Sequence, residues 1–502
     1  MITTNVWNAF LERAEASPAG DAIVREDGTL TFDALRTRAA QYAAILETRG
    51  VGRHDRVLLW VRNDPEMAAA LLGAWAVEAI PVLMDADETA RNLAHAVERV
   101  SPRQVVRPAA EALPAEVSVP ELTPADVPRS VVAGPHASRA LPTDPASIVF
   151  TSGSTGKPKG VTQSHGSLVR ACRAVAYYLG LSSEDRILCS IPWSFDYGYG
   201  QLLSTLVIGA THVLPSGRDP ISVCTAIERH RPSVLPGIPS VFTYLLRGVS
   251  PFRDTDVSSI RTLTNTGGTI PGAILGELLE MFTERRLFLN YGLTESYRTS
   301  YLDPRLVSSH SKSIGRPVPG VDVVIVREDG GSADEGEAGE IVHRGDFLFL
   351  GYWNDPEATA KALRPDPLVR AESVARFPAL FTGDLGYLDE DGLLYFVGRN
   401  DHLIKSMGVR VSPGDVEEIL DESGLVKEVA VFGMPHEMIG QEVWVAVTPK
   451  DETVDVVPEL KILARERLSP YMTPRRYIVR DALPKTRTGK IDYVKLKDEA
   501  RR

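Results

Sequence analysis

The sequence has few cysteines, no long apolar run and no excess of positive charge. The three cysteines, Cys172, Cys189 and Cys224, form no CxxC pair, which is typical of small buried residues in a reducing compartment. The most apolar stretch, residues 68–83, is interrupted by a glutamate and a proline and is too short to span a bilayer. The first residues, MITTNVWNAF, lack a basic region followed by an apolar one. We therefore expect no export signal, a cytoplasmic protein and no membrane partner.

The charge balance is acidic, with a formal net charge of −11 over 502 residues. This sign argues against nonspecific nucleic-acid binding and against binding to an anionic membrane surface. The net charge does not decide whether the substrate is anionic, because lysines gathered at one site can outweigh the negative charge of the whole protein. The hydrophobic share of 43% and the charged share of 24% are ordinary for a soluble globular protein. The length suggests about three structural units of roughly 150 residues each.

Residues 147–161, SIVFTSGSTGKPKGV, form the most distinctive stretch of the chain. Its apolar beginning predicts a buried strand, and the Thr, Ser, Gly and Lys residues that follow let the backbone direct several N–H groups at phosphate oxygens. Lys157 and Lys159 add positive charge. The stretch is not a Walker A loop, because Gly153 and Gly156 are too close together. A mobile linker is the alternative, but a linker is seldom attached so tightly to a strand or so rich in lysine.

Apolar periodicity predicts alternating helices and strands before residue 313, which favours a doubly wound α/β sheet. Residues 313–400 are richer in short β runs and turns, so we expect a small β-rich subdomain there. Residues 415–502 alternate helix and strand again and predict a small α+β domain of about a hundred residues.

The ten residues 151–160, TSGSTGKPKG, match at every position the signature of the adenylate-forming superfamily, which the chain therefore resembles. This superfamily includes acyl-CoA synthetases, adenylation domains of nonribosomal peptide synthetases and luciferases. The resemblance implies an α/β fold, with a large layered N-terminal domain at residues 1–400 and a small mobile C-terminal domain at residues 401–502. It also implies that one group of residues binds the phosphates of ATP: Thr151, Ser152, Gly153, Ser154, Thr155, Gly156 and Lys159.

A second motif, NYGLTE, follows a predicted strand at residues 290–295. An aromatic ring beside a glycine-containing turn can stack on a purine, and a carboxylate acting with phosphate oxygens is the usual arrangement for Mg²⁺. An ordinary turn with an exposed glutamate is the alternative. The resemblance implies that Tyr291 lies against adenine, that Thr294 and Glu295 act in catalysis, and that Glu295 holds the metal. It assigns further residues to the nucleotide site: Asn290, Gly267 and Gly268.

Two further motifs carry charged residues on short loops, TGDLG around Asp384 and GRNDHLIK after Gly398. A carboxylate is suited to hold two ribose hydroxyls, and a guanidinium is suited to bind phosphate or ribose. The alternatives are an aspartate that caps a turn and a solvated charged turn. The resemblance implies ribose binding for Asp384, a nucleotide contact for Arg399, and a hinge at Asp401 about which the C-terminal domain rotates.

Lys490 ends the motif PKTRTGK. A lysine on a glycine-flanked loop of an acidic protein is usually a solvated surface residue. The resemblance implies instead that Lys490 is the adenylation catalyst. In that role its ammonium binds both the substrate carboxylate and the α-phosphate, and it stabilises charge as the new bond forms.

The acid pocket is expected around residues 193–200, 237–240, 265–269 and 297–299, with four candidate substrate contacts: Trp193, Asp196, Tyr197 and Arg298. Asp196 stands where amino-acid-activating domains of the superfamily pair the substrate ammonium, but a helix N-cap is an alternative. Arg298 either pairs a second carboxylate or braces Asp196 or Glu295. Gly198 and Gly200 are expected to leave room in the pocket.

These motifs together imply an ATP-dependent ligase. A carboxylate, from an amino acid or a small acyl acid, attacks the α-phosphate, pyrophosphate leaves, and the acyl adenylate passes to a pantetheine thiol. The expected acceptor is CoA or a separate acyl or peptidyl carrier protein, because no carrier segment follows Lys490. An acyl-CoA ligase for a non-amino acid is one alternative. A non-catalytic nucleotide-binding module is another, and it would need neither Lys490 nor a hinge.

Overall fold

The structure is a computed structural model, and it describes residues 3–110, 112–115, 117–130, 137–151, 158–283, 285–369, 377–399, 403–406, 409–436, 439–486 and 490–501. The chain forms two compact units. The first contains Met1–Val324 and Val342–Phe381, and the second contains Ile325–Ile341 and Thr382–Arg502. The division passes through three strands: β16 (Val321–Val326), β17 (Gly339–Gly345) and β20 (Pro378–Leu388). The expected boundary at residues 400 and 401 lies outside the described residues and stays a prediction.

One sheet of the first unit carries the stretch that predicts phosphate binding. Its strands follow the order β18-β8-β7-β4-β3-β5-β6; β7, β4, β3, β5 and β6 run parallel, while β8 and β18 are antiparallel to their neighbours. The strands are β3 (Arg56–Val61), β4 (Ile80–Asp85), β5 (Gln104–Val106), β6 (Glu121–Leu122), β7 (Pro145–Thr151), β8 (Lys159–Ser164) and β18 (Gly351–Tyr352). Val57 and Leu59 of β3 pack on one face, and Leu58 and Trp60 pack on the other. Burial of both faces is typical of parallel sheets.

A second sheet of the first unit runs in the order β15-β14-β13-β12-β11-β9-β10-β1-β2. Its strands are β1 (Asp21–Arg25), β2 (Gly28–Thr31), β9 (Arg186–Leu188), β10 (Thr211–Val213), β11 (Val234–Gly237), β12 (Thr262–Asn265), β13 (Arg286–Tyr291), β14 (Ser300–Leu302) and β15 (Ser313–Pro317). β11, β12 and β13 are parallel; β11 and β12 end at the paired residues Gly237 and Asn265, and β13 continues two residues beyond Leu289, the partner of Asn265. Ligands of open α/β sheets bind at such carboxyl ends.

Five helices share one hydrophobic core in the first unit: α1 (Val6–Ala16), α2 (Phe32–Thr48), α3 (Pro65–Ala76), α5 (His165–Leu179) and α6 (Asp196–Ile208). Local sequence explains where they begin and end. α3 begins with an Asp64 side chain that accepts from the Glu66 N–H, followed by a proline at the first helical position. α5 ends at Gly180, whose φ of 63° suits glycine.

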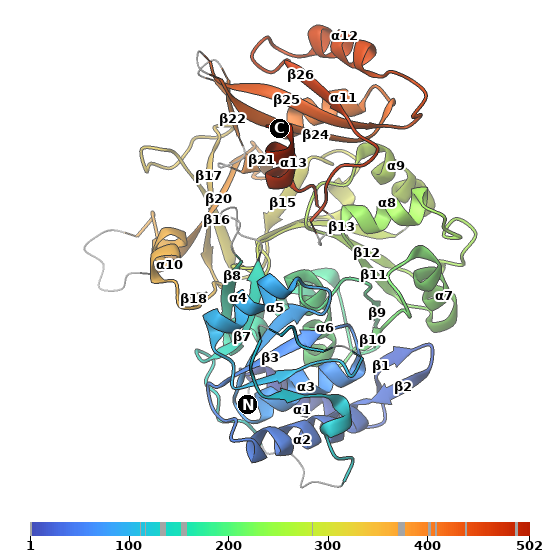
Figure 1. Cartoon of the computed structure of the whole chain (residues 1–502), viewed down its shortest axis with the longest axis vertical. Helices are drawn as coiled ribbons and strands as arrows, with labels where there is room; N and C mark the ends of the chain where they lie inside the picture. Colours follow the sequence, from blue (N-terminus) through green and yellow to red (C-terminus); the bar gives the residue numbers. More distant parts are fainter. Residues whose placement is uncertain are drawn as a thin grey trace. The chain divides into compact units, whose positions relative to one another are not determined.

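Further helices cover the outer faces of the two sheets. α4 (Ala90–Val100) packs on the outer face of the first sheet, through Leu93, Ala96 and Val100. Beside the second sheet lie α7 (Pro220–His230), α8 (Pro239–Arg247) and α9 (Gly272–Met281), on the right of Figure 1. Near the end of this unit, α10 (Pro356–Ala362) precedes β19 (Leu363–Pro365), which pairs with β20. The first unit is therefore a layered α/β structure, as the sequence predicts.

The second unit is a smaller α+β structure. Its strands are β21 (Leu394–Arg399), β22 (Ile404–Ser406), β23 (Val409–Val411), β24 (Val426–His436), β25 (Gly440–Pro449) and β26 (Arg476–Val479). Its helices are α11 (Pro413–Asp421), α12 (Val457–Arg467) and α13 (Tyr493–Ala500). On β25, Val443 and Val445 face the core that includes α11 and α12, whereas Trp444 and Ala446 face the core that includes Leu496 of α13. This period of two places helices on both faces of the sheet.

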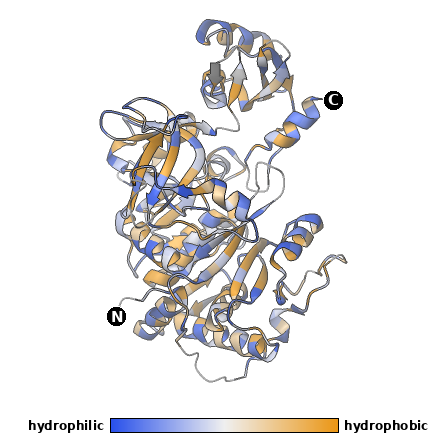
Figure 2. Cartoon of the chain, turned by 90° about the vertical axis from the view of Figure 1, so that its left-hand side faces the viewer, coloured by the Kyte–Doolittle hydropathy of each residue, from blue (hydrophilic) through white to orange (hydrophobic). Residues whose placement is uncertain are grey.

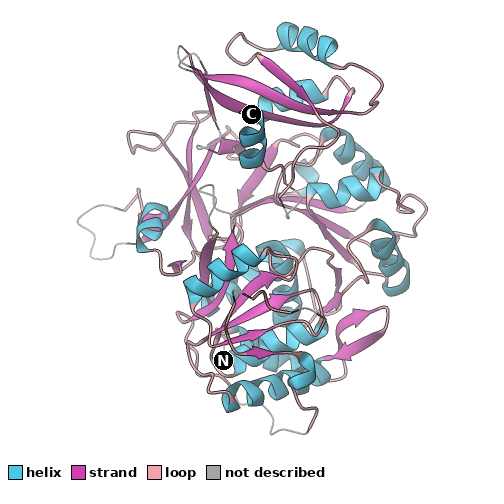
Figure 3. Cartoon of the chain, viewed as in Figure 1, coloured by secondary structure: helices cyan, strands magenta, loops and turns pink. Residues whose placement is uncertain are grey.

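The alternation of helices and strands that the sequence predicts is confirmed, and Figure 3 shows it along the chain. Most strands carry hydrophobic residues, while hydrophilic residues gather on helices and loops (Figure 2). Cys172, Cys189 and Cys224 are buried free thiols, as expected. Among the described residues, no helix is both long enough and apolar enough to cross a membrane.

Candidate active site

The hairpin of β7 and β8 ends at the predicted phosphate-binding loop. Thr151, the last residue of β7, pairs with Lys159, the first residue of β8. The loop residues assigned to the ATP phosphates lie outside the described residues, and their role stays a prediction: Ser152, Gly153, Ser154, Thr155 and Gly156. The strand register nevertheless fixes both ends of the loop.

Tyr352 connects this hairpin to the predicted metal ligand. It lies on β18, opposite Val161 of β8. The Lys159 ammonium lies 4.8 Å from the centroid of the Tyr352 ring, and the Tyr352 hydroxyl donates to Oε1 of Glu295 at 2.7 Å. Glu295 is half-buried, and it forms no ion pair with any residue that the structure describes. One tyrosine thus contacts the cation and the anion that the sequence assigns to Mg-ATP.

Hydrogen bonds hold the backbone on both sides of Glu295. The Gln163 side-chain amide, from β8, donates to the carbonyl oxygen of Thr294 at 2.5 Å. The Phe349 N–H donates to the carbonyl oxygen of Glu295 at 2.9 Å. Thr294 and Glu295 are therefore held beside the strand that begins with Lys159.

The predicted adenine side lies at the carboxyl ends of β12 and β13. Tyr291, the last residue of β13, is half-buried. The Asn290 side chain is committed to the fold: its amide donates to the carbonyl oxygen of Asn265 at 3.0 Å, and its oxygen accepts from the Tyr178 hydroxyl at 2.8 Å. Gly267 has a φ of 79°, and the adjacent carbonyl oxygen of Gly268 accepts from Asn265 at 2.9 Å. Asn290 thus braces the two strand ends that carry Tyr291 and the glycine pair.

Asp196 is the first residue of α6 and is half-buried. The N-cap is Phe195, and no side-chain hydrogen bond caps this helix. The alternative in which Asp196 is the N-cap is therefore wrong. A carboxylate in the first turn still interacts favourably with the helix dipole.

Arg298 lies over the aromatic ring of Tyr197, with 5.2 Å between its guanidinium carbon and the ring centroid. Its side chain is buried, and no carboxylate of a described residue forms an ion pair with it. The charge of Asp196 nevertheless acts on Arg298, so the alternative in which Arg298 braces Asp196 or Glu295 stays a prediction. Burial lowers the pKa of Arg298, but the nearby tyrosines and Asp196 raise that pKa overall, so the group stays charged.

Trp193 packs in the core of the first unit and is 1% exposed. Its indole N–H donates to Nε2 of His212 at 3.3 Å, and the two rings meet edge to face. Burial lowers the pKa of His212 to about 3, so the imidazole is a neutral acceptor. These contacts give Trp193 a structural role, and its contact with substrate stays a prediction.

Gly198 and Gly200 do not open space in the structure. A Cβ at Gly198 would lie 2.2 Å from the carbonyl oxygen of Pro192, and a Cβ at Gly200 would lie 2.8 Å from the Tyr297 hydroxyl. The prediction that these glycines leave room in a pocket is wrong. They are needed because backbone and tyrosine approach the first turns of α6 closely.

The second unit carries two of the predicted nucleotide contacts. Asp384 on β20 and Arg399 on β21 pair across the two strands, with 3.6 Å between Nε and Oδ1. The Asp384 side chain is buried, whereas that of Arg399 is 45% exposed. Gly383 has a φ of 73°, and its N–H donates to Glu340 at 2.9 Å, which fixes the turn before Asp384. The structure therefore brings these two predicted residues together.

Lys490 is an exposed residue of the second unit, immediately before Ile491. Its carbonyl oxygen accepts from the Thr486 N–H at 2.7 Å, and Lys485 and Ile491 form a β-bridge beside it. No ion pair of the Lys490 ammonium is found within the described residues. The backbone of Lys490 is thus fixed by Thr486 while the residue itself is exposed. Asp401, the predicted hinge, lies outside the described residues.

Comparison with known families decides the assignment. The AMP-binding enzyme family matches residues 10–353, which is more than half of the chain, and the AMP-binding enzyme C-terminal domain matches residues 415–490. The chain belongs to the AMP-binding enzyme family. The resemblance to the adenylate-forming superfamily is thereby confirmed. This AMP-binding enzyme activates a carboxylic acid as its acyl adenylate.

Curated relatives include CoA ligases and much larger synthases. Feruloyl-CoA synthase of Amycolatopsis sp is 32% identical over 510 residues, covering 98% of this chain and 97% of that enzyme. Long-chain-fatty-acid–CoA ligase of Bacillus subtilis is 32% identical over 361 residues, covering 71% of this chain and 62% of that enzyme. The chain thus spans less than two thirds of the latter relative. Bacitracin synthase 3 of Bacillus licheniformis is 27% identical over 489 residues, covering 97% of this chain but 8% of that protein.

Solved structures bear out the fold. The o-succinylbenzoate CoA synthetase (MenE) of Bacillus subtilis, in complex with the acyl-adenylate intermediate OSB-AMP, is 25% identical with a TM-score of 0.88, covering 100% of this chain and 99% of that one. The same enzyme with ATP and a magnesium ion has a TM-score of 0.87. The predicted fold class and the predicted use of ATP and Mg²⁺ are confirmed at the level of the family. The residues present fit both, because Glu295 is a carboxylate without an ion pair among the described residues and Lys159 supplies positive charge nearby.

Two residues of the AMP-binding enzyme's site were not predicted from its sequence. Tyr352 contacts both Lys159 and Glu295, and Gln163 holds Thr294. No local signal identifies Tyr352, because its place depends on pairing between β18 and β8, which are far apart in the chain. Gln163 is an uncharged residue inside an ordinary strand.

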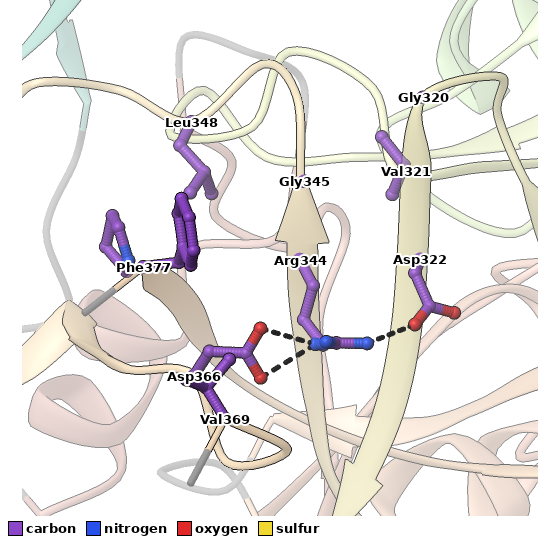
Figure 4. A pocket seen from close by; sticks show the side chains of 10 residues that line it. Gly320, Val321, Asp322, Arg344, Gly345, Leu348, Asp366, Val369 and Phe377 are labelled. Atoms are coloured by element: carbon purple, nitrogen blue, oxygen red, sulfur yellow. Dashed lines mark hydrogen bonds and ion pairs between the residues drawn. The ribbon is translucent and has the colours of Figure 1, made fainter. Parts of the chain in front are cut away.

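A separate pocket of about 590 Å³ lies in the first unit and is lined by none of the predicted site residues (Figure 4). Leu348 and Phe377 form an apolar part of its wall. Arg344 lies between two carboxylates, binding Asp366 at 2.8 Å and also Asp322. Because both partners neutralise this guanidinium, we assign the pocket no anion-binding role.

Proposed function

We propose that this AMP-binding enzyme is an acid–CoA ligase for a carboxylic acid that carries no amino group. The observation that carries the proposal is the buried positive charge of Arg298 in the predicted acid pocket, above Tyr197 and electrostatically coupled to Asp196. A substrate ammonium at Asp196 would meet this like charge. Two unit charges 4–8 Å apart repel by roughly 2–4 kcal/mol at an effective dielectric constant of about 20. The full-length similarity to feruloyl-CoA synthase supports CoA as the thiol.

In the first half-reaction, the substrate carboxylate attacks the α-phosphate of ATP and pyrophosphate leaves. Thr151, Lys159 and the loop between them would hold the β- and γ-phosphates. Glu295 would hold Mg²⁺, and that ion would supply positive charge that offsets the phosphate oxygens. Tyr291 and the glycine pair at residues 267–268 receive the adenine, and Asp384 with Arg399 receives the ribose.

Lys490 supplies the remaining positive charge, at the α-phosphate and at the attacking carboxylate. Lys490 is exposed and its backbone is held by Thr486, which supports this role. In the second half-reaction, the C-terminal domain rotates about Asp401, Lys490 leaves the site, and the CoA thiol attacks the acyl carbonyl while AMP departs. Carrier-protein thiols are the competing acceptor.

ATP–pyrophosphate exchange against amino, aliphatic and aryl acids tests the acid class, and thioester formation with CoA tests the acceptor. We expect exchange with non-amino acids only, followed by formation of the CoA thioester. Exchange confined to amino acids, or thioester formation with a carrier protein but not with CoA, would refute the proposal.

Lys490→Ala tests whether Lys490 serves adenylation but not thioester formation. We expect loss of pyrophosphate exchange, with thioester formation from preformed adenylate retained. Lys495→Ala is the matched control, because Lys495 is an exposed lysine on the following helix. Equal loss of both half-reactions in Lys490→Ala would contradict the role.

A further inference from the structure

The Arg298 side chain is a buried charge that Asp196 influences electrostatically but with which no described carboxylate makes direct contact. The residue is 5% exposed, and its Nε has no hydrogen-bond partner. No carboxylate of a described residue forms an ion pair with it. A buried guanidinium that no anion contacts is costly, because the interior does not replace the hydrogen bonds to water that the charge has lost.

The surrounding tyrosines do not supply the counter-charge. The Tyr178 hydroxyl donates to Asn290 at 2.8 Å, and the Tyr197 hydroxyl donates to the carbonyl oxygen of Thr264 at 3.2 Å. Burial raises the pKa of both hydroxyls, so they are neutral at physiological pH. The Tyr197 ring lies 5.2 Å from the guanidinium carbon and offsets part of the cost as a cation–π contact. An aromatic face cannot replace an anion that hydrogen-bonds to the guanidinium nitrogens.

The backbone places Arg298 at this position under strain. Tyr297, immediately before it, has a φ of 56°, in the left-handed region that a bulky residue rarely adopts. The Tyr297 hydroxyl donates to the carbonyl oxygen of Gly200 at 3.2 Å, and the ring packs against Gly200, where a Cβ would not fit. The missing side chain at Gly200 therefore lets Tyr297 hold a conformation that buries Arg298 among the predicted acid-pocket residues.

We propose that Arg298 binds a second carboxylate of the substrate, so that the enzyme activates one carboxylate of a dicarboxylic acid while the other stays bound to the guanidinium. Arg298 follows the predicted Mg²⁺ ligand Glu295 by three residues in the chain and lies over Tyr197 of α6, a predicted acid contact. The bidentate geometry of a guanidinium suits a carboxylate. This inference rests on the proposed function, since it requires a substrate without an ammonium beside Arg298.

The test compares acids that differ only in the second carboxylate, with pyrophosphate exchange as the readout. Hexanoate is paired with adipate, and benzoate with its dicarboxylic analogues. We expect at least one diacid to exceed its matched monoacid in kcat/KM by about 100-fold or more, since losing one partner of a buried charge pair costs several kcal/mol. Equal rates within each pair, or a preference for the monoacids, would overturn the inference and leave the acid–CoA ligase proposal standing. Exchange confined to amino acids would refute the proposed function itself.

Variants of Arg298 separate substrate recognition from other roles. Arg298→Met removes the charge at similar length, and we expect it to lower diacid kcat/KM by about 100-fold while monoacid kcat/KM stays the same or rises. Arg298→Lys keeps the charge without the planar fork and should retain part of the preference. Arg305→Met is the matched control, because the Arg305 side chain is 87% exposed. Equal loss for both acid classes would mean that Arg298 serves the reacting carboxylate or the fold, which would overturn the inference.

A binding measurement on the wild-type enzyme does not depend on whether these variants fold. Without ATP, we expect the diacid to raise the unfolding temperature in a concentration-dependent manner and the matched monoacid to have less effect at equal concentration. The same shift from both acids would contradict a second-carboxylate site.

Discussion

We expect that removing the Tyr352 hydroxyl lowers kcat/KM for ATP. The hydroxyl donates to Oε1 of Glu295 at 2.7 Å, while the Tyr352 ring lies under the Lys159 ammonium. Tyr352→Phe deletes the hydrogen bond and keeps the ring. A hydrogen bond to a charged group contributes about 1.5–3 kcal/mol, which corresponds to roughly 10- to 150-fold in an equilibrium constant. We expect kcat/KM for ATP to fall by about 10-fold or more, because an unfixed carboxylate binds Mg²⁺ less well.

The assay is pyrophosphate exchange at saturating acid, with ATP and Mg²⁺ varied in turn. If the hydroxyl acts by orienting Glu295, raised Mg²⁺ should restore part of the lost rate. Tyr352→Leu removes the ring as well, so it should lose more than Tyr352→Phe through the contact with Lys159. Tyr177→Phe is the matched control, because Tyr177 is 79% exposed.

A double-mutant cycle with Glu295→Gln decides whether the two residues act together. If they do, adding Tyr352→Phe to Glu295→Gln should cost little further activity. Three results would refute the reasoning: kcat/KM for ATP within about twofold of wild type in Tyr352→Phe, additive losses in the double variant, or tighter Mg-ATP binding in Tyr352→Phe. The last would mean that the hydroxyl holds the carboxylate away from the metal.

Two other predictions concern the scaffold. Gly198→Ala should destabilise the protein by about 1–3 kcal/mol and raise KM for the acid, because its Cβ would lie 2.2 Å from the carbonyl oxygen of Pro192. Gly276→Ala is the matched control: its Cβ would meet open space on α9, so it should stabilise the protein by about 0.5–1 kcal/mol. Chemical unfolding measures both changes in stability. Burial lowers the pKa of His343 to about 4, so its neutral form contributes stability that is complete above pH 6.5 and is lost as pH falls from 6.5 toward 4. His343→Gln should therefore flatten the pH dependence of unfolding in that window by up to about 3 kcal/mol, and an unchanged slope would contradict this cause.

Local chemistry explains why much of the fold and part of the site could be predicted. Apolar periodicity identified strands such as β7, whose buried residues and following loop are adjacent in the sequence. Thr151 and Lys159 belong to one hairpin, and Thr294 and Glu295 to one turn, so each pair was found from one stretch of sequence. Residues of such a motif are close in space because they are close in the sequence.

Contacts between distant segments could not be predicted in this way. The role of Tyr352 depends on the pairing of β18 with β8. A glycine looks the same in the sequence whether it opens a pocket or makes room for neighbouring atoms. Gly198 and Gly200 make room for a carbonyl oxygen and a tyrosine, and only the packing around α6 shows this. The alternative that made Asp196 the N-cap of α6 was wrong by one residue, since Phe195 is the N-cap. Helix ends are commonly uncertain by that amount when judged from sequence.

The segment from Glu295 to Thr299 couples the nucleotide side to the acid side. It carries the predicted metal ligand and Arg298, and it is fixed by a buried chain in which the Ser296 and Thr299 hydroxyls lie 3.0 Å apart and Thr299 lies 3.0 Å from Nδ1 of His343. Because His343 is neutral and Nε2 lies 2.8 Å from the carbonyl oxygen of Asp346, Nε2 carries the proton and Nδ1 accepts from Thr299. A substrate carboxylate at Arg298 would therefore be held on the same rigid segment as Glu295. Positioning of the acid and positioning of Mg-ATP would then depend on the same few hydrogen bonds. Variants of Thr299 should therefore change KM for the acid and KM for ATP together.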